Sequence, residues 1–509
     1  MPRSLSEYLP SLLHGAGIIF LGICIQYMLS FFTRVILARG LGPSKFGRLS
    51  IGVAIVATTT TFVLLGMNSG IGRYLPRMQT VSEKRSVIVS GFQISLSVAI
   101  LSTICVYLAA GWLATSVFDD ASLRVVIKVF SLCIPLFTLL KLTVGGIRGL
   151  EKALPRVLVE NLAFPGGRLI FTGVALLFGA TVTNVSWGYF LAYALGAVTG
   201  LYYLYTRIPL LGRPRDSMHR TLLSFSAPLV ITAAMATVIA DIDTFIIGYF
   251  LTPRYVGIYN VVYPFAALAS IFLSSLSFLF MPVVSELHAA GEFEQISIIY
   301  AIATKWLFLA TTPIVLLFVM FGDNLLGITF GSEYLPGELT LSLLAIGFGT
   351  HTIFGPNRDT LTSIGRTRWI MISNIGIALF NVGMNIVLVP RFGIEGAAVA
   401  TAASYTFLNC LYSYRLYSDM GINPFKRRFI RHLFTGTIVG LIFITTENWL
   451  APTSTLGITL IYLLYLAVYA AALSYVGILD SKEIEFLSNI AKEPENRLGR
   501  LIQRLGIFE

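Results

Sequence analysis

The chain has 509 residues, of which 56% are hydrophobic and only 12% are charged, and its mean hydropathy is +0.80. Ordinary soluble domains carry about 25% charged residues, so this composition excludes a soluble protein and indicates a polytopic membrane protein. The formal net charge of +11 is no sign of nucleic-acid binding, because surplus lysine and arginine in membrane proteins collect in cytoplasmic loops.

Apolar segments long enough to cross a bilayer follow one another along most of the chain. A spanning helix needs roughly 20 apolar residues, and we count about 14 such segments. The first is too long for a signal peptide and lacks a small-x-small cleavage site, so we expect it to be retained. The predicted fold is therefore an all-α membrane protein, with spans at about 12–38, 48–68, 87–113, 125–147, 157–179, 185–206, 225–250, 256–281, 298–321, 338–357, 369–389, 394–416, 432–449 and 455–478.

The orientation follows from the connectors between these spans. Basic residues gather near 73–85, 148–156, 207–220, 366–368, 426–431 and in the tail. The alternate connectors carry mainly aspartate and glutamate, so the positive-inside rule places both termini in the cytoplasm. One exception is the first outer turn, which carries Arg39, Lys45 and Arg48. The other is the inner connector near 283–297, which carries glutamates without a basic residue.

An internal repeat divides the chain. A shift of about 210 positions brings Pro43 onto Pro253 and Gly47 onto Gly257, and repeats of this kind are typical of secondary transporters. We predict two pseudo-symmetric six-helix lobes and two additional C-terminal helices. The predicted parts are an N-terminal lobe (1–220), a C-terminal lobe (221–420), spans 13 and 14 (421–480) and a cytoplasmic amphipathic tail (481–509).

Three segments carry a resemblance to a known family: residues 37–47 (LARGLGPSKFG), residues 243–260 with DTFIIG and VGIYN, and residues 385–398 (NIVLVPRFGIEGAA). Together they resemble Wzx-like polysaccharide flippases, a branch of the MATE-like exporter superfamily, over essentially residues 1–480. The resemblance implies a V-shaped pair of lobes and alternating access. It also implies translocation of a lipid-linked oligosaccharide to the outer leaflet of a prokaryotic plasma membrane, for cell-surface polysaccharide or glycoprotein glycan synthesis.

Cations within the predicted spans are candidates for binding the phosphate of such a substrate or for gating. Arg34, Lys141 and Arg168 qualify, because an ionisable group at bilayer depth costs at least a few kcal/mol unless it faces a cavity or a partner. Arginine can also bind phosphate oxygens in a bidentate manner. The alternative is that each cation pairs with a carboxylate or reaches a headgroup.

Asp241 and Asp243 lie in the predicted seventh span, about 200° apart on a helix, so they cannot both face the same point. Position 243 is equivalent to position 33 in the repeat. We therefore hypothesise that Arg34 pairs with Asp243 or Asp241 when the outer gate is shut. The alternative is that the aspartates couple transport to Na⁺ or H⁺.

Three asparagines of the predicted eleventh span, Asn374, Asn381 and Asn385, share a helix face. Hydrogen bonding between helices and contact with a glycan are the two interpretations. The histidines lack metal-binding spacing, so we expect no metal site, and we expect no cofactor apart from a coupling ion.

Other functions remain open on the residues alone. A cation-coupled drug or metabolite antiporter would need an acidic cavity, whereas the charges here are mixed. A membrane glycan polymerase or glycosyltransferase lacks support, since the sequence has no P-loop and no D-x-D pair outside the apolar spans. A scaffold has no reason to sustain buried charges. Expected partners are the lipid-linked oligosaccharide, membrane lipids and glycosyltransferases or a polymerase of the same pathway, but no nucleic acid.

Overall fold

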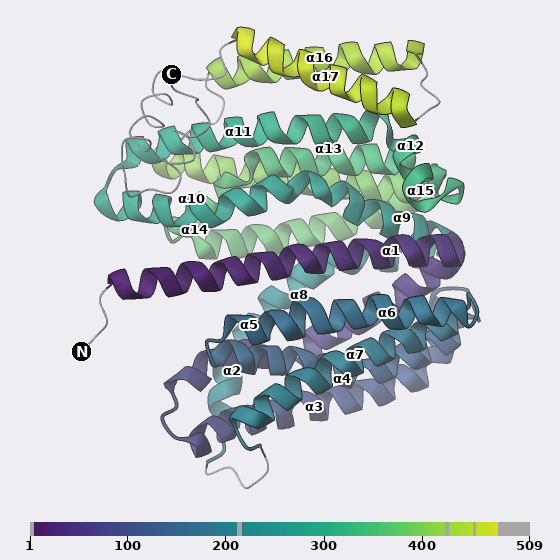
Figure 1. The fold of residues 1–509 in the computed structure, drawn as a ribbon, viewed down its shortest axis with the longest axis vertical. Helices are drawn as coiled ribbons and strands as arrows, with labels where there is room; N and C mark the ends of the chain where they lie inside the picture. The colour runs from purple at the N-terminus through teal and green to yellow at the C-terminus, as the bar shows by residue number, and fades with distance from the viewer. Residues whose placement is uncertain (1–4, 211–215, 423–426, 451–454, 477–509) are drawn as a thin grey trace. The chain divides into compact units, whose positions relative to one another are not determined.

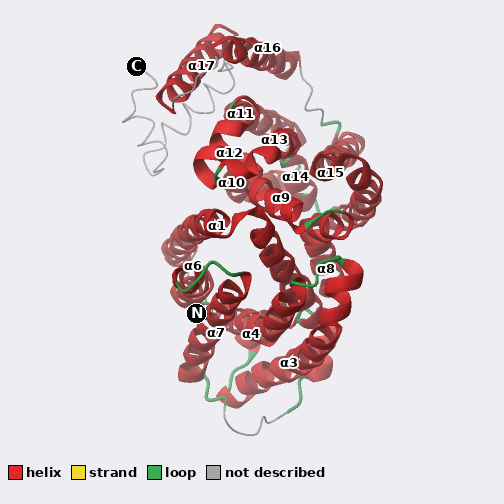
Figure 2. Ribbon diagram, turned by 90° about the vertical axis from the view of Figure 1, so that its right-hand side faces the viewer, coloured by secondary structure: helices red, strands yellow, loops and turns green. Residues whose placement is uncertain are grey.

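The computed structural model describes residues 5–210, 216–422, 427–450 and 455–476. Within these ranges all regular structure is helical (Figure 2). The predicted all-α fold is therefore confirmed, and every predicted span coincides with helical structure in the described part of the chain.

Seventeen α-helices follow one another along the described chain (Figure 1). In order they are α1 (Leu5–Val63), α2 (Met67–Tyr74), α3 (Val81–Trp112), α4 (Leu123–Gly149), α5 (Ala153–Arg156), α6 (Phe164–Leu177), α7 (Val182–Arg207), α8 (His219–Phe250), α9 (Pro253–Ala266), α10 (Ile271–Ala290), α11 (Phe293–Met320), α12 (Gly322–Phe330), α13 (Glu338–Phe354), α14 (Pro356–Ser363), α15 (Thr367–Met420), α16 (Arg427–Leu450) and α17 (Thr455–Val476). A π-helical segment, η3 (Val157–Ala163), leads into α6, and a 3₁₀ segment, η5 (Ser332–Gly337), precedes α13.

Two of these helices each contain two predicted spans joined at a kink. In α1 the kink is at Gly42, with φ 71° and ψ 167°, and in α15 it is at Gly393, with φ 63° and ψ −141°. Both conformations have positive φ, which glycine adopts without the steric penalty of a β-carbon. The described chain contains eight segments long and apolar enough to cross a bilayer, and these two are the longest.

The structure divides into two compact units. The first contains the described residues within Met1–Phe265, Asp323–Leu341 and Asn374–Ser404. The second contains those within Ala266–Gly322, Ser342–Ser373 and Tyr405–Glu509. These units do not follow the predicted lobe boundaries at residues 220 and 420. Those boundaries stay a prediction, because compactness groups residues by contact and not by internal repetition.

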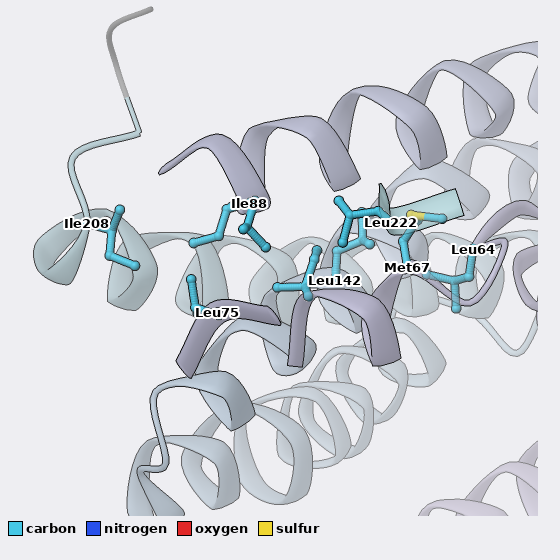
Figure 3. Packing of buried hydrophobic residues seen from close by; sticks show 9 residues of the cluster. Leu64, Met67, Leu75, Ile88, Leu142, Ile208 and Leu222 are labelled. Atoms are coloured by element: carbon cyan, nitrogen blue, oxygen red, sulfur yellow. The ribbon is translucent and has the colours of Figure 1, made fainter. Parts of the chain in front are cut away.

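In the first unit, α3, α4, α6 and α7 lie side by side and α1 packs against α4 and α6 (Figure 1). Figure 3 shows one of its apolar cores, in which Met67 of α2, Ile88 of α3, Leu142 of α4 and Leu222 of α8 are fully buried. Because lipid tails are as apolar as leucine, close packing and not the hydrophobic effect holds helices together within a bilayer.

The second unit packs α10 against α11 and α14, and α16 against α11 and α17. It buries a polar cluster, in which the side-chain amide of Asn357 donates to the backbone oxygen of Asn409 at 3.2 Å. The ring of His351 stacks on Tyr405 with centroids 4.5 Å apart. None of the residues singled out as site candidates lies in this unit.

The three basic residues of the first outer turn each bind a different connector in the first unit. Arg39 donates to the last carbonyl groups of α12, and Lys45 donates to the carbonyl oxygen of Ala180 at 2.9 Å. Arg48 pairs with Asp120 at 2.6 Å. These three cations therefore hold neighbouring segments of the first unit together, which gives a structural reason for basic residues in a turn that the predicted orientation puts outside.

Candidate functional site

Three of the predicted site residues line one cavity in the first unit. Arg34 comes from α1, Arg168 from α6 and Asp241 from α8, and the cavity has a volume of about 110 Å³. We call it the arginine cavity. Its other polar lining residues are Tyr189 of α7, Asn260 of α9 and Ser30, Thr33 and Ser50 of α1. The cavity is large enough for a small polar group or a few water molecules. With two arginines and one aspartate, its lining carries a net positive charge.

Arg168 is held in this cavity mainly by aromatic rings. Its guanidinium carbon lies 5.7 Å from the ring centre of Phe164 and 5.9 Å from that of Tyr189. Its buried Nε atom has no hydrogen-bond partner among the described residues. A guanidinium packed on aromatic faces keeps N–H groups free for an anion, so the geometry suits recognition of a phosphate oxygen.

Asp243 lies on the same helix as Asp241 but in different surroundings. Its side chain is only 2% exposed. One carboxylate oxygen accepts hydrogen bonds from the hydroxyls of Tyr259 and Thr401, the latter at 2.9 Å, and the other accepts from the amide of Asn385 at 2.9 Å. The two aspartates therefore meet different neighbours, as their spacing predicts.

The three candidate asparagines of α15 also differ in their surroundings. Asn385 donates to Asp243 and also to the backbone oxygen of Asn381 at 3.0 Å, whereas its own Oδ1 atom is buried without a partner among the described residues. Asn374 is half-buried and does not line the arginine cavity. Carboxylate, amide and hydroxyl oxygens around Asp243 are the ligand types that hard cations prefer.

The hypothesised pair of Arg34 with an aspartate is not formed here. No ion pair in the described part of the chain joins Arg34 to Asp241 or Asp243. The donors on Asp243 are all neutral, whereas Asp241 shares its cavity with Arg34. A gate pair involving Arg34 remains a prediction about another state of the protein.

Lys141 lies apart from the two arginines. Its ammonium group is 3.4 Å from Glu160, which also pairs with Arg156 at 3.2 Å. Lys141 nevertheless lines a second cavity, of about 300 Å³, whose lining also includes Asp241. Asp241 thus borders both cavities, with arginines on one side and a lysine on the other.

Several residues of these sites were not singled out from the sequence. Among them are Tyr189 and Asn260 in the arginine cavity and Tyr259 and Thr401 around Asp243. Tyr259 and Asn260 lie within the VGIYN segment, sixteen and seventeen residues after Asp243, so that segment carried a signal. Thr401 lies in a run of small residues, GAAVATAA at 396–403, a pattern that indicates close helix packing and gives no sign of a site.

The fold defines the class of protein: a multi-pass helical membrane protein with the fold of the MATE-like transporters. A structure titled "Lipid II flippase MurJ, inward closed conformation" superposes with a TM-score of 0.72 at 14% identity, covering 89% of this chain and 98% of that one. An inward-facing multidrug-resistance MATE family transporter of the MOP superfamily gives a TM-score of 0.65 at 14% identity, covering 79% and 98%.

Sequence comparison identifies the family. The model for "Polysaccharide biosynthesis protein" matches residues 12–288, and the MatE model matches residues 228–387. The chain therefore belongs to the polysaccharide biosynthesis protein family.

Curated relatives agree with this assignment. The probable low-salt glycan biosynthesis flippase Agl15 of Haloferax volcanii is 28% identical over 215 residues, 42% of this chain and 45% of that protein. A membrane protein of Methanocaldococcus jannaschii, MJ1068, is 30% identical over 36% of this chain and 37% of its own length. The putative O-antigen transporter of Shigella flexneri is 21% identical over 72% of this chain and 88% of that protein. The alignments thus span less than half of the length of Agl15 and of MJ1068.

Proposed function

We propose that this protein is a flippase for a lipid-linked oligosaccharide, that is, a glycan on a polyprenyl phosphate or pyrophosphate. It moves the substrate from the cytoplasmic to the outer leaflet by alternating access, for synthesis of a cell-surface polysaccharide or a glycoprotein glycan. The family assignment and the names of the relatives support a glycan carrier.

The observation that carries the proposal is the pair of arginines in one cavity. Arg34 and Arg168 line it together, and the Nε atom of Arg168 has no partner in the described structure. A phosphate or pyrophosphate brings acceptor oxygens that match guanidinium donors. In this proposal Arg34 and Arg168 bind the substrate phosphate, Asp241 competes with it for the arginines, and Lys141 contributes positive charge from the neighbouring cavity.

Asp243 has a different proposed role, that of the coupling site. A buried carboxylate surrounded by neutral donors and amide oxygens suits reversible binding of H⁺ or Na⁺. Because Asn385 and Thr401 come from α15 and Tyr259 from α9, a bound cation would change the contacts among three helices. Asn381 supports Asn385 in this arrangement. We also propose that Asn374 contacts the glycan.

A cation-coupled antiporter for drugs or metabolites is the second candidate, since the MatE model matches the chain and MATE transporters share the fold. The net positive lining of the arginine cavity favours an anionic substrate over a cationic drug. Both candidates are transporters and not enzymes. We place the protein in a prokaryotic plasma membrane with both termini in the cytoplasm, beside the glycosyltransferases or polymerase of its pathway.

The decisive experiment uses proteoliposomes that contain a short-chain prenyl-pyrophosphate oligosaccharide. Protein-dependent access of the sugar to an external lectin or glycosidase is the readout. We expect the wild-type protein to give access and Arg34→Gln and Arg168→Gln to lose it at least about tenfold, the effect of about 1.4 kcal/mol. Arg124→Gln, which changes an exposed arginine of α4, is the matched control. Access no greater than in empty liposomes, together with gradient-driven uptake of organic cations, would establish the antiporter instead.

A further inference from the structure

An apolar groove runs along the surface of the first unit between the η3–α6 segment and α7. One wall is a stripe of residues at four-residue spacing: Leu158, Leu162, Gly166 and Ile170. Leu195 and Tyr203 of α7 contribute to the other wall. The groove has a volume of about 580 Å³, and almost all of its lining is apolar.

The groove is open to the surroundings of the protein, and in a membrane-spanning bundle those surroundings are lipid. Leu158 is 49% exposed and Ile170 is 62% exposed. Twelve residues separate them, which is at most about 18 Å, because the α-helical rise holds only for the α6 part and the π-helical η3 part rises less per residue. This length is comparable with half of a bilayer core about 30 Å thick. The groove therefore has the length of one acyl chain in one leaflet.

One end of the groove is basic. Pro155 belongs to its lining, and the next residue, Arg156, is about one-third exposed and pairs with Glu160. At the same end Arg207 is exposed, and its guanidinium carbon lies 5.8 Å from the ring centre of Tyr203. Arg168, next to Gly167 at the other end, lines the arginine cavity instead. The exposed positive charge is thus concentrated at one end of the groove.

We infer that this groove binds an anionic phospholipid, with one acyl chain along the stripe of α6 and the phosphate beside Arg156 and Arg207. Tyr203 supplies an amphipathic ring at the level where the chain meets the headgroup, as tyrosines do at membrane interfaces. Cations at the cytoplasmic end of spanning helices attract anionic headgroups, and the proposed orientation puts this basic end on that side. The site is separate from the arginine cavity, so it does not depend on which substrate the protein carries.

The structure offers a matched pair of glycines on α6 for the test. A β-carbon on Gly166 or on Gly173 would meet no atom within 4 Å, so both positions open onto free space. Gly166 lines the groove, whereas Gly173, two turns further along the same helix, does not. Gly166→Leu therefore puts a side chain into the groove, and Gly173→Leu makes the same chemical change outside it.

The experiment measures phosphatidylglycerol and phosphatidylcholine retained by the purified full-length protein in native mass spectrometry. We expect the wild-type protein to retain one more phosphatidylglycerol than Gly166→Leu, and Gly173→Leu to behave as wild type. Arg207→Gln, a change at an exposed side chain, should lower the preference for phosphatidylglycerol over phosphatidylcholine about fivefold.

Either of two results overturns the inference. One is equal retention of the two lipids by the wild-type protein. The other is an equal loss of phosphatidylglycerol in Gly166→Leu and Gly173→Leu. If Gly166→Leu does not fold, the preference of Arg207→Gln for phosphatidylglycerol over phosphatidylcholine is the test. A preference equal to that of the wild-type protein refutes the site.

Discussion

Gly47 and Gly257 lie backbone to backbone where α1 and α9 cross. A β-carbon on Gly47 would lie 1.7 Å from the carbonyl oxygen of Pro253, and one on Gly257 would lie 2.0 Å from the carbonyl oxygen of Pro43. The contact is reciprocal, and these are the residues that the 210-residue shift pairs. Reciprocal contacts of this kind occur where a two-fold axis relates two segments.

This crossing predicts that neither glycine tolerates a side chain. Gly257→Ala should lower the free energy of unfolding by about 1–3 kcal/mol, because the two backbones must separate to admit a methyl group. The thermal unfolding midpoint of the purified protein in detergent measures the effect.

Gly383→Ala is the control for that change, since a β-carbon there meets nothing within 4 Å. It should be neutral or slightly stabilising, because alanine is the better helix former. Equal midpoints for the two variants would show that the backbones are not in close contact.

The hydroxyl of Tyr259 is a buried donor to Asp243, so its removal should be costly. Tyr259→Phe is expected to destabilise the protein by about 1–3 kcal/mol. This is the range for losing a hydrogen bond when its buried acceptor, here a carboxylate oxygen of Asp243, is left with one donor fewer. Tyr255→Phe, on the same helix, removes a hydroxyl from a side chain that is 40% exposed and should change the midpoint little. Equal thermal unfolding midpoints for Tyr259→Phe and Tyr255→Phe would contradict the prediction.

Asp243→Asn tests the proposed coupling site. The amide is nearly isosteric but neither binds a proton nor attracts a cation as a carboxylate does, so flipping by the variant should not respond to a Na⁺ or pH gradient. The proteoliposome assay with and without each gradient makes the measurement. A variant that keeps the gradient dependence of the wild-type protein would place coupling elsewhere.

The pair of Arg48 and Asp120 predicts a loss of stability in acid. Burial acts to raise the pKa of Asp120, but hydrogen bonds from Ser122 and Arg48 outweigh it and hold the pKa below the ordinary 3.8. A lowered folded-state pKa contributes stability that is complete above the unfolded value and is lost as pH falls through the folded value.

The unfolding midpoint should therefore fall more steeply below about pH 4 in the wild-type protein than in Asp120→Asn, which cannot form the ion pair at any pH. Asp119→Asn, at the neighbouring position, controls for the change in net charge. A parallel decline in the wild-type protein and Asp120→Asn would contradict the prediction.

Much of the fold could be predicted because its signals are local. Runs of apolar residues determine spanning helices, since every backbone polar group must be satisfied within the segment. Gly42 and Gly393 were visible as glycines in connectors, but whether the chain would turn sharply or run on as one kinked helix depends on their φ and ψ angles. Residue type alone does not specify those angles.

The candidate site was predicted in part. Buried charges such as Arg34 and Asp243 attract notice because they are costly in an apolar helix. The partners of Asp243 could not be recognised in the sequence. Tyr259 and Thr401 are ordinary residues in membrane helices, and their contact with Asp243 depends on how three helices pack. Lys141 and Arg168 look alike in the sequence, yet one pairs with Glu160 and the other is held between aromatic rings.

The sequence by itself determined that this is a multi-pass helical membrane protein of a particular family, with its charges in recognisable places. Hydropathy and short motifs contain that information, since each depends on neighbouring residues. Only the tertiary structure decided which charges share a cavity and which are paired. Asp243 and Asn385 are 142 positions apart, and the packing of α8 against α15 brings them to 2.9 Å. No local pattern encodes such a distance, because it depends on the register and rotation of helices that the chain reaches only after folding.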